Sequence, residues 1–317
     1  MSSVTDIKLR CPMTPLAKPA GAAGLQIDAV DPSGRYVSAH ATDQREMFTS
    51  VLWVDGAPTY LRFADSVQIL SINSHGVAVG VASANSPSSA EWSFRYANGV
   101  ATRLQVPAGW RAYGNVTINE RGDIADTIKP ENDQPEGASK GIVWKAGSTK
   151  PTTVPLPPQG QVVAITADTR LWGNIGDGKF NEVNLWDLAG NKTKLPHPDG
   201  YPVAPRATAG IYATGKLAMP GAIPRWDITT NQLTKITAVP DGADTQGMHI
   251  SATGWITDGL QVAYRPDGTP MRMTAPGINE VMSAGVTDNG DVFGTYYGKG
   301  NDGSSFTPVV WHCGSAA

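Results

Sequence analysis

The chain has 317 residues with a net charge of −3, contains 35 glycines and 24 prolines, and only 17% of its residues are charged. The basic residues are scattered and form no stripe that could follow a phosphate backbone, so nucleic acid is not expected as a partner. The apolar runs are far shorter than the roughly 20 residues that span a bilayer, so we expect no membrane segment. Turn residues recur about every eight to twelve positions, and no stretch has the spacing of an amphipathic helix, which is typical of an all-β chain.

The first residues show no basic stretch followed by an apolar one, so no secretory signal is recognisable. We therefore expect a cytoplasmic location if Met1 is the native start, whereas a secreted protein without its leader would look the same. We also expect a monomer.

The sequence contains a repeated unit, with copies "SINSHGVAVG" at residues 71–80, "TINERGDIAD" at 117–126 and "GVTDNGDVFG" at 285–294. Each copy predicts a strand, a tight turn and a second strand. Two markers each recur seven times, at intervals of 36 to 48 residues. The turn marker is Gly34, Gly76, Gly122, Arg170 in place of a glycine, Gly215, Gly254 and Gly290. The second marker is an aromatic residue before a later turn, at Trp53, Tyr96, Trp144, Trp186, Trp226, Tyr264 and Trp311.

This period is that of a four-stranded unit, and seven units predict an all-β, seven-bladed β-propeller of antiparallel blades in a single domain, residues 1–317. The five tryptophans of the second marker are expected in the blade cores. An outer strand follows only six of the aromatic markers, because the chain ends shortly after Trp311. The segment "DIKLRCP" at residues 6–12 matches the outer strand "VATRLQVP" in its basic residue, leucine and proline. We therefore predict that residues 6–12 supply the outer strand of the last blade and close the ring.

Both cysteines, Cys11 and Cys313, fall in this closing blade. Aligning Leu9 with Leu61, and Trp311 with Trp53, places the two cysteines near opposite ends of the outer hairpin. A disulfide needs Cα atoms within about 7 Å, so free thiols are predicted.

The repeated unit resembles the HAF repeat of bacterial propeller proteins, whose pattern is Ile-Asn, two residues, Gly, a Val-Gly strand, then an aliphatic-Leu-Trp strand and a Gly turn. "SINSHGVAVG" and "SVLWVDG" match this pattern, whereas residues 160–277 match it poorly and the His-Ala-Phe of the name is absent. The resemblance implies a propeller fold and carries over no activity, because propellers hold many unrelated functions.

No histidine or cysteine spacing is typical of a metal site, and no nucleophile motif or nucleotide-binding loop is present, so neither a metal nor a cofactor is expected. The blade template places His40 at the end of a second strand and His249 at the start of a first strand, both near the mouth of the channel. With Glu46 they are the candidate acid/base residues. The alternative is that each histidine is a polar channel residue bonded to the backbone.

In a propeller, the loops from fourth to first strands and from second to third strands share one face, where function concentrates. Large aromatic and basic residues gather in these segments and are the candidate ligand-binding residues: Trp110, Arg111, Tyr113, Tyr201, Arg206, Tyr296 and Tyr297. For Trp110 the alternative is a plug over the edge of its own blade.

Three functions fit these residues. The first is binding of a small organic molecule in the central funnel, with acid/base chemistry of the lyase, cyclase or isomerase type that needs no cofactor. The second is a protein-interaction platform without catalysis. The third is carbohydrate binding by exposed aromatic side chains. A deep apolar funnel beside a perturbed histidine favours the first, and a filled, flat channel favours the second.

Overall fold

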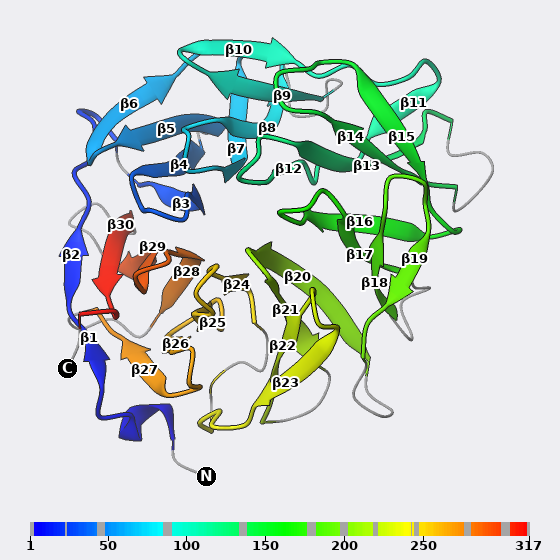
Figure 1. The fold of residues 1–317 in the computed structure, drawn as a ribbon. Coiled ribbons are helices and arrows are strands. Elements are labelled where there is room, and N and C mark those ends of the chain that lie inside the picture. The colour runs from blue at the N-terminus through cyan, green and yellow to red at the C-terminus, as the bar shows by residue number, and fades with distance from the viewer. Residues whose placement is uncertain are drawn as a thin grey trace.

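The computed structural model describes residues 3–22, 24–42, 48–84, 91–132, 138–175, 182–196, 202–217, 221–241, 243, 247–275, 280–298 and 305–315. Seven antiparallel sheets stand as blades around a central channel, and the first strand of each blade lies nearest the channel (Figure 1). The predicted seven-bladed, all-β propeller is confirmed. In the part of the chain described, no helix has the length and apolar character needed to cross a bilayer.

Blades 1 to 5 are meanders that run outward from the channel in chain order. Blade 1 consists of β3 (Gln26–Val30), β4 (Tyr36–Thr42), β5 (Phe48–Val54) and β6 (Ala57–Leu61). Blade 2 consists of β7 (Ser66–Ile72), β8 (Ala78–Ser83), β9 (Trp92–Ala97) and β10 (Val100–Arg103). In blade 3 the first strand is split into β11 (Trp110–Ala112) and β12 (Thr117–Ile118), followed by β13 (Ile124–Pro130), β14 (Lys140–Trp144) and β15 (Pro151–Pro155).

The next two blades repeat the same order. Blade 4 consists of β16 (Gly160–Ile165), β17 (Leu171–Ile175), β18 (Glu182–Trp186) and β19 (Lys192–Lys194). Blade 5 consists of β20 (Val203–Ala209), β21 (Tyr212–Leu217), β22 (Ile223–Asp227) and β23 (Gln232–Ile236).

The N-terminal segment takes part in the last two blades. Blade 6 consists of β24 (His249–Ile250), β25 (Ile256–Thr257), β26 (Val262–Tyr264) and β27 (Pro270–Met273), and β1 (Arg10–Cys11) adds a parallel fifth strand to β27. Blade 7 consists of β28 (Val281–Val286), β29 (Asp291–Gly298) and β30 (Ser305–His312), and β2 (Met13–Pro15) is its fourth strand. In Figure 1 the blue β2 lies beside the red β30.

Closure by the N-terminal segment is confirmed, but its register differs from the predicted one. The outer strand of blade 7 is β2, and residues 10–11 of the predicted strand pair with blade 6 instead. Further upstream, the 3-10 helix η1 (Val4–Asp6) buries Val4 in the core between blades 5 and 6, where the Val4 N–H donates to the Asp241 carbonyl at 3.0 Å. Residues 3–15 therefore connect three successive blades.

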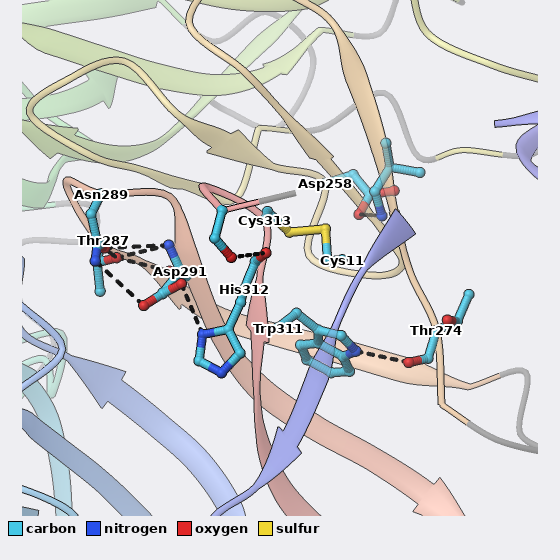
Figure 2. Close-up of a disulfide and its surroundings, with 11 residues drawn as sticks. Cys11, Asp258, Thr274, Thr287, Asn289, Asp291, Trp311, His312 and Cys313 are labelled. Carbon is cyan, nitrogen blue, oxygen red and sulfur yellow. Dashed lines mark hydrogen bonds and ion pairs between the residues drawn. A yellow bond between two sulfur atoms is a disulfide. The ribbon is translucent and has the colours of Figure 1, made fainter. Parts of the chain in front are cut away.

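This register corrects the prediction of free thiols. Met13 pairs with Trp311, so two residues farther along the antiparallel ladder Cys11 comes opposite Cys313. The two residues form a disulfide with Cα atoms 4.5 Å apart (Figure 2). The prediction was wrong because it aligned residues 6–12 with the outer strands of other blades and so displaced Cys11 along the hairpin.

The repeated tryptophans lie in the blade cores, as predicted. Trp53, Trp144, Trp186, Trp226 and Trp311 are at most 1% exposed. Because a buried indole N–H needs an acceptor, four of them donate to a backbone carbonyl just beyond the outer strand of the preceding blade. The pairs are Trp53 with Ala17 at 2.7 Å, Trp144 with Gln105 at 2.9 Å, Trp226 with Pro196 at 2.8 Å and Trp311 with Thr274 at 3.0 Å. Each of these bonds connects adjacent blades.

The turn residue three positions before the repeated glycine also connects adjacent blades, at the end of the channel where the first strands end. In blade 3 the Asn119 Oδ1 accepts the N–H groups of Arg121 and Asp123, both at 3.0 Å, and its Nδ2 donates to the Thr166 carbonyl of blade 4 at 2.8 Å. Asn73 repeats the arrangement one blade earlier and donates to the Asn119 carbonyl. The recurring "IN" of the sequence is thus explained by a turn cap that also contacts the next blade.

Substituting this asparagine separates its two roles. We expect Asn119→Ala to lower the free energy of unfolding by about 2 to 3 kcal/mol, because a buried group loses three hydrogen bonds. Asn119→Asp keeps the acceptor but replaces the donor to blade 4 by a carboxylate oxygen opposite the Thr166 carbonyl, so a loss of at least about 1 kcal/mol is expected for it. Urea unfolding of both variants checks the prediction. No loss in Asn119→Asp would show that the contact between blades contributes nothing, and equal losses in the two variants would show that the turn cap contributes nothing.

Two turn positions differ from the predicted ones. In blade 4 the left-handed conformation is adopted by Thr169, at φ 68°, and not by Arg170. In blade 5 the turn glycine is Gly210, at φ 54°, whereas Gly215 lies inside β21.

Gly215 instead occupies another position that is glycine in several blades. This position lies in the second strand of the blade, opposite a bulge of the first strand. Gly80, Gly173, Gly215 and Gly294 occupy it in four blades, and a Cβ there would lie 1.8 to 2.3 Å from a carbonyl oxygen of the first strand. Counting from the paired residues, Asp126 takes this position in blade 3 and Asp258 in blade 6. In blade 1 the position is taken by Ala39. In the two blades with an aspartate, only two residues of the first strand, β12 or β24, pair beside it.

Asp126 fills the space that the split first strand of blade 3 leaves. Its Oδ1 accepts the N–H groups of Thr127 at 2.7 Å and Asn115 at 3.2 Å. Burial of the carboxyl is the largest influence on it and raises its pKa to about 7.

Candidate functional site

A cavity of 260 Å³ is lined by residues of blades 6, 7 and 1. It lies at the end of the channel where the first strands begin and the second strands end. This end of the channel is called the channel mouth below. The cavity is lined by Gln26, Ile27, Met248, Asp258, Gly259, Leu260, Met282, Ser283, Ala284 and Thr295. These residues come from the start of β3, the segments flanking β24 and β25, and the facing parts of β28 and β29.

Most polar groups of this lining are engaged within the fold. The Ser283 hydroxyl donates to Thr257 Oγ1 at 2.8 Å, and the Thr295 hydroxyl oxygen accepts the Ile27 N–H at 3.0 Å. The Asp258 Oδ1 accepts the N–H groups of Leu260 at 2.8 Å and Val262 at 3.0 Å. What remains for a ligand is a mainly apolar surface with few polar groups, which is typical of small-molecule sites.

A buried aspartate–histidine pair lies on β3 and β4 of blade 1. Asp28 is the extra residue of the bulge in β3, and its Oδ1 accepts from His40 Nδ1 at 2.8 Å and from Gln68 Nε2 at 3.0 Å. The His40 and Asp28 side chains are only 11% and 7% exposed. His40 is opposite Gln26 across the β3–β4 ladder, and Gln26 lines the cavity. The hydrogen bond from Gln68 places the pair on the side of blade 1 that faces blade 2, and neither Asp28 nor His40 lines the cavity.

The Asp28 contact determines which ring nitrogen of His40 can react. A carboxylate can only accept a hydrogen bond, so Nδ1 carries the hydrogen of the neutral ring and Nε2 holds the lone pair. Among the described residues none forms a hydrogen bond with Nε2, and the Phe48 ring packs edge-on against the imidazole with centroids 4.7 Å apart. An imidazole oriented by a carboxylate in this way is suited to general acid/base catalysis.

His249, the other candidate histidine, contacts the backbone of the next blade. Its Nε2 lies 3.2 Å from the Ser283 carbonyl oxygen, which can only accept, so Nε2 is the protonated nitrogen. Burial lowers the pKa of His249 to about 4, and the ring is therefore neutral near pH 7. The side chain connects the first strands of blades 6 and 7 beside Met248 and Ser283 of the cavity.

Of the blade 3 candidates, Trp110 and Arg111 lie on β11, and Tyr113 follows directly after it. Trp110 is half-buried against the core of its blade, and Lys140 Nζ lies 4.3 Å from its ring centroid, an arrangement that suits the plug alternative. Tyr113 is 45% exposed, with Lys129 Nζ 3.9 Å from its ring centroid, and Arg111 is exposed on β11.

The other candidates are spread over two further blades. Arg206 is exposed at the bulge of β20. Tyr296 is half-buried against the core of blades 6 and 7, while Tyr297 is exposed and contacts the Phe306 ring. Glu46 and Tyr201 lie outside the described residues. Of the candidates that are described, none lines the cavity.

The sequence reasoning missed Asp28 and the cavity lining. The signal for Asp28 is a carboxylate in the first-strand segment "LQIDAV", two residues after a glutamine that recurs in other blades as Gln68 and Gln161. For Asp258 the signal is an aspartate where four other blades have glycine. In the described ranges, no three His, Cys, Asp or Glu side chains gather closely enough to hold a metal ion.

No protein-family model and no curated protein matches the sequence. Solved structures do match the fold. Virginiamycin B lyase from Staphylococcus aureus is 14% identical with a TM-score of 0.57, covering 95% of this chain and 99% of the lyase. An oligogalacturonate lyase in complex with manganese is 12% identical with a TM-score of 0.63, covering 96% of this chain and 98% of the other. A puromycin-hydrolyzing peptidase from Mycobacterium tuberculosis is 12% identical with a TM-score of 0.59, and 92% of this chain covers 53% of the peptidase. At these identities the similarity shows the propeller fold alone.

Proposed function

We propose that this propeller binds a small organic molecule in the cavity at the channel mouth, and that His40, oriented by Asp28, is the acid/base group that acts on it. The observation that carries the proposal is a buried aspartate–histidine pair in blade 1, whose first strand also contributes Gln26 and Ile27 to a mainly apolar cavity. The blades are proposed to be divergent HAF-type repeats. Two lyases and part of a peptidase share the fold, which is compatible with catalysis at the channel mouth.

His40 Nε2 would take a proton from the bound molecule or give one to it. The Asp28 carboxylate would hold the ring in the required tautomer and stabilise the imidazolium form while the proton is on Nε2. Gln68 donates to the same carboxylate oxygen and fixes its position from blade 2. His249 has its Nε2 on a carbonyl and a pKa lowered to about 4, so we assign it a positioning role between blades 6 and 7.

A turnover experiment tests the role of His40. Wild-type protein and the variants His40→Asn and His75→Asn are each incubated with a bacterial metabolite extract, and the metabolites are quantified by mass spectrometry. His75 is the matched control, because it lies in a first-to-second-strand turn at the other end of the channel. We expect His75→Asn to match wild type and His40→Asn to consume its metabolite at least about 100-fold more slowly. Undiminished turnover by His40→Asn, or no metabolite consumed by wild type, would refute the acid/base role.

A binding experiment tests the cavity independently of catalysis. Leu260 is 43% exposed and lines the cavity, so Leu260→Trp is expected to narrow it with little effect on folding. Ile211 is 42% exposed in the blade 5 turn at the other end, and Ile211→Trp is the matched control. Equilibrium dialysis against the same extract should show metabolites retained by wild type and Ile211→Trp and lost from Leu260→Trp. Equal retention by the two tryptophan variants would place the binding site elsewhere.

A further inference from the structure

Three positively charged side chains gather at the outer edge of blade 6, where β1 runs parallel to β27 (Figure 1). They are Lys8, which lies two residues before β1, Arg10 in β1 and Arg272 in β27. Arg10 and Arg272 are direct partners in the parallel ladder. Neighbouring strands lie about 4.8 Å apart, so the two arginine side chains start from adjacent backbone positions.

The burial of neighbouring residues shows to which face of the sheet these side chains point. The residues that flank them pack in the core between blades 6 and 7: Leu9, Cys11, Met271 and Met273. Successive side chains of a strand point to opposite faces, so Arg10 and Arg272 point to the other face. On that face Val262, the partner of Arg272 in β26, packs in the core between blades 5 and 6. Both guanidinium groups therefore lie on the side of blade 6 that faces blade 5.

No carboxylate balances this charge within the part of the chain that the structure describes. Neither arginine forms an ion pair there, and Lys8 forms none either. The Arg272 Nε is buried without a hydrogen-bond acceptor. Asp6, the acidic residue of the same N-terminal segment, has its carboxylate bonded to the Ser3 N–H at 2.8 Å.

Two features of this arrangement are unfavourable for the protein alone. Like charges directly opposite each other in a sheet destabilise it, and Arg10 faces Arg272 in this way. Buried donors are nearly always satisfied in folded proteins, whereas the Arg272 Nε is not. The chain as a whole has a net charge of −3, so the cluster does not follow from a generally basic surface. A bound anion would remove the repulsion and supply acceptors.

The strand that carries Arg10 is held in place from both sides. The disulfide of Cys11 with Cys313 ties it to blade 7, and the Val4 N–H ties η1 to the Asp241 carbonyl. Groups that are ordered before binding lose little entropy when a ligand arrives, which favours affinity.

We propose that Lys8, Arg10 and Arg272 form a binding site for a doubly charged phosphate group. Guanidinium groups donate paired hydrogen bonds to phosphate oxygens, and three positive charges are better matched by a dianion than by the single charge of a carboxylate. The site is separate from the cavity at the channel mouth and goes beyond the proposed function. A soluble phosphate ester and the headgroup of phosphatidic acid both carry this group.

Binding of inorganic phosphate tests the site, with acetate as the singly charged comparison. NMR of arginine side chains labelled with carbon-13 follows both titrations at pH 8, in about 150 mM NaCl to screen weak surface attraction. We expect saturable shifts at Arg10 and Arg272, with a Kd on the order of 1 mM or below and acetate at least about tenfold weaker. Arg35 and Arg170 are internal controls, since their Nε atoms donate to Asp55 and Asp168.

The variant Arg10→Gln separates binding from a structural role. It should bind phosphate at least about tenfold more weakly, while Arg121→Gln, at an exposed turn of blade 3, should match wild type. Without phosphate the Tm of Arg10→Gln should equal or exceed that of wild type, because the like-charge pair is gone. Phosphate should raise the Tm of wild type and leave that of Arg10→Gln unchanged.

Phosphatidylcholine vesicles with and without phosphatidic acid distinguish the two sources of the phosphate group. Sedimentation of wild type, but not of Arg10→Gln, with the acidic vesicles supports the site and identifies a lipid headgroup. Saturable phosphate binding without vesicle binding supports the site and identifies a soluble ester. Shifts that do not saturate, that are equal at Arg35 and Arg170, or that acetate reproduces at the same concentration would overturn the proposal and leave an ordinary solvated face.

Discussion

Replacing Cys11 and Cys313 together by serine should lower the free energy of unfolding by about 5 to 6 kcal/mol, and Tm by about 8 °C, because the disulfide closes nearly the whole chain. The two cysteines are 302 residues apart in sequence. A cross-link over so long a loop removes more entropy from the unfolded chain than a short one does. Without it, the ring is closed at the outer edge of blade 7 only by the short strand β2.

Urea unfolding of the double variant and of wild type, each with and without dithiothreitol, measures this effect. Wild type unfolded to equilibrium in reductant should coincide with the variant, which shows that the loss comes from the cross-link and not from buried serine hydroxyl groups. If the variant in the absence of reductant unfolds at the wild-type midpoint, the disulfide does not secure the ring.

Asp126→Asn should stabilise the protein above pH 7 and have little effect near pH 4. The folded pKa of Asp126 is raised by burial from 3.8 to about 7, so the folded state binds a proton that the unfolded state has already released. Stability therefore falls as pH rises from 4 to 7, by on the order of 4 kcal/mol if the full shift is realised. Asparagine stays neutral, keeps an acceptor for the Thr127 and Asn115 N–H groups, and has its amide near the Ser93 hydroxyl.

The difference in unfolding free energy between variant and wild type isolates this effect. His249 acts in the opposite direction, because its folded pKa is lowered to about 4 and stability is lost as pH falls from 6.5 towards 4. That contribution is common to both proteins and cancels in the difference. Asp227→Asn is the control, since the pKa of Asp227 is lowered to about 2 by hydrogen bonds from Thr229 and Thr230. A difference that stays flat from pH 5 to 8 for Asp126→Asn would show that this carboxyl is ionised throughout.

The architecture could be predicted because every blade repeats the same physical requirements. Buried tryptophans and turn glycines recur at the period of a four-stranded sheet, and the loss of one outer strand at the C-terminal end points to the N-terminal segment. The register of that segment could not be read in the same way. Residues 6–12 resemble an outer strand, but the pairing is made by β2, and Leu9 packs near the core of blades 6 and 7. An error of a few residues in this alignment was enough to separate the two cysteines.

The candidate site was less predictable than the fold, since its lining comes from three blades and depends on how neighbouring first strands meet. His40 and His249 were selected from their blade positions, but the partner that distinguishes them, Asp28 or the Ser283 carbonyl, is visible only in three dimensions. The aromatic candidates were selected by residue type from the loops expected at the channel mouth. Trp110 and Tyr296 pack against blade cores instead of lining the cavity, because an apolar ring near a sheet edge is stabilised by burial within its own blade.

The most direct test of the account is a crystal structure of the protein soaked in a metabolite that the equilibrium dialysis shows to be retained. The account predicts density between Gln26, Met248 and Met282, with a polar atom of the ligand about 2.6 to 3.2 Å from His40 Nε2. Density over Trp110 and Tyr113 of blade 3 with nothing in the cavity would contradict it.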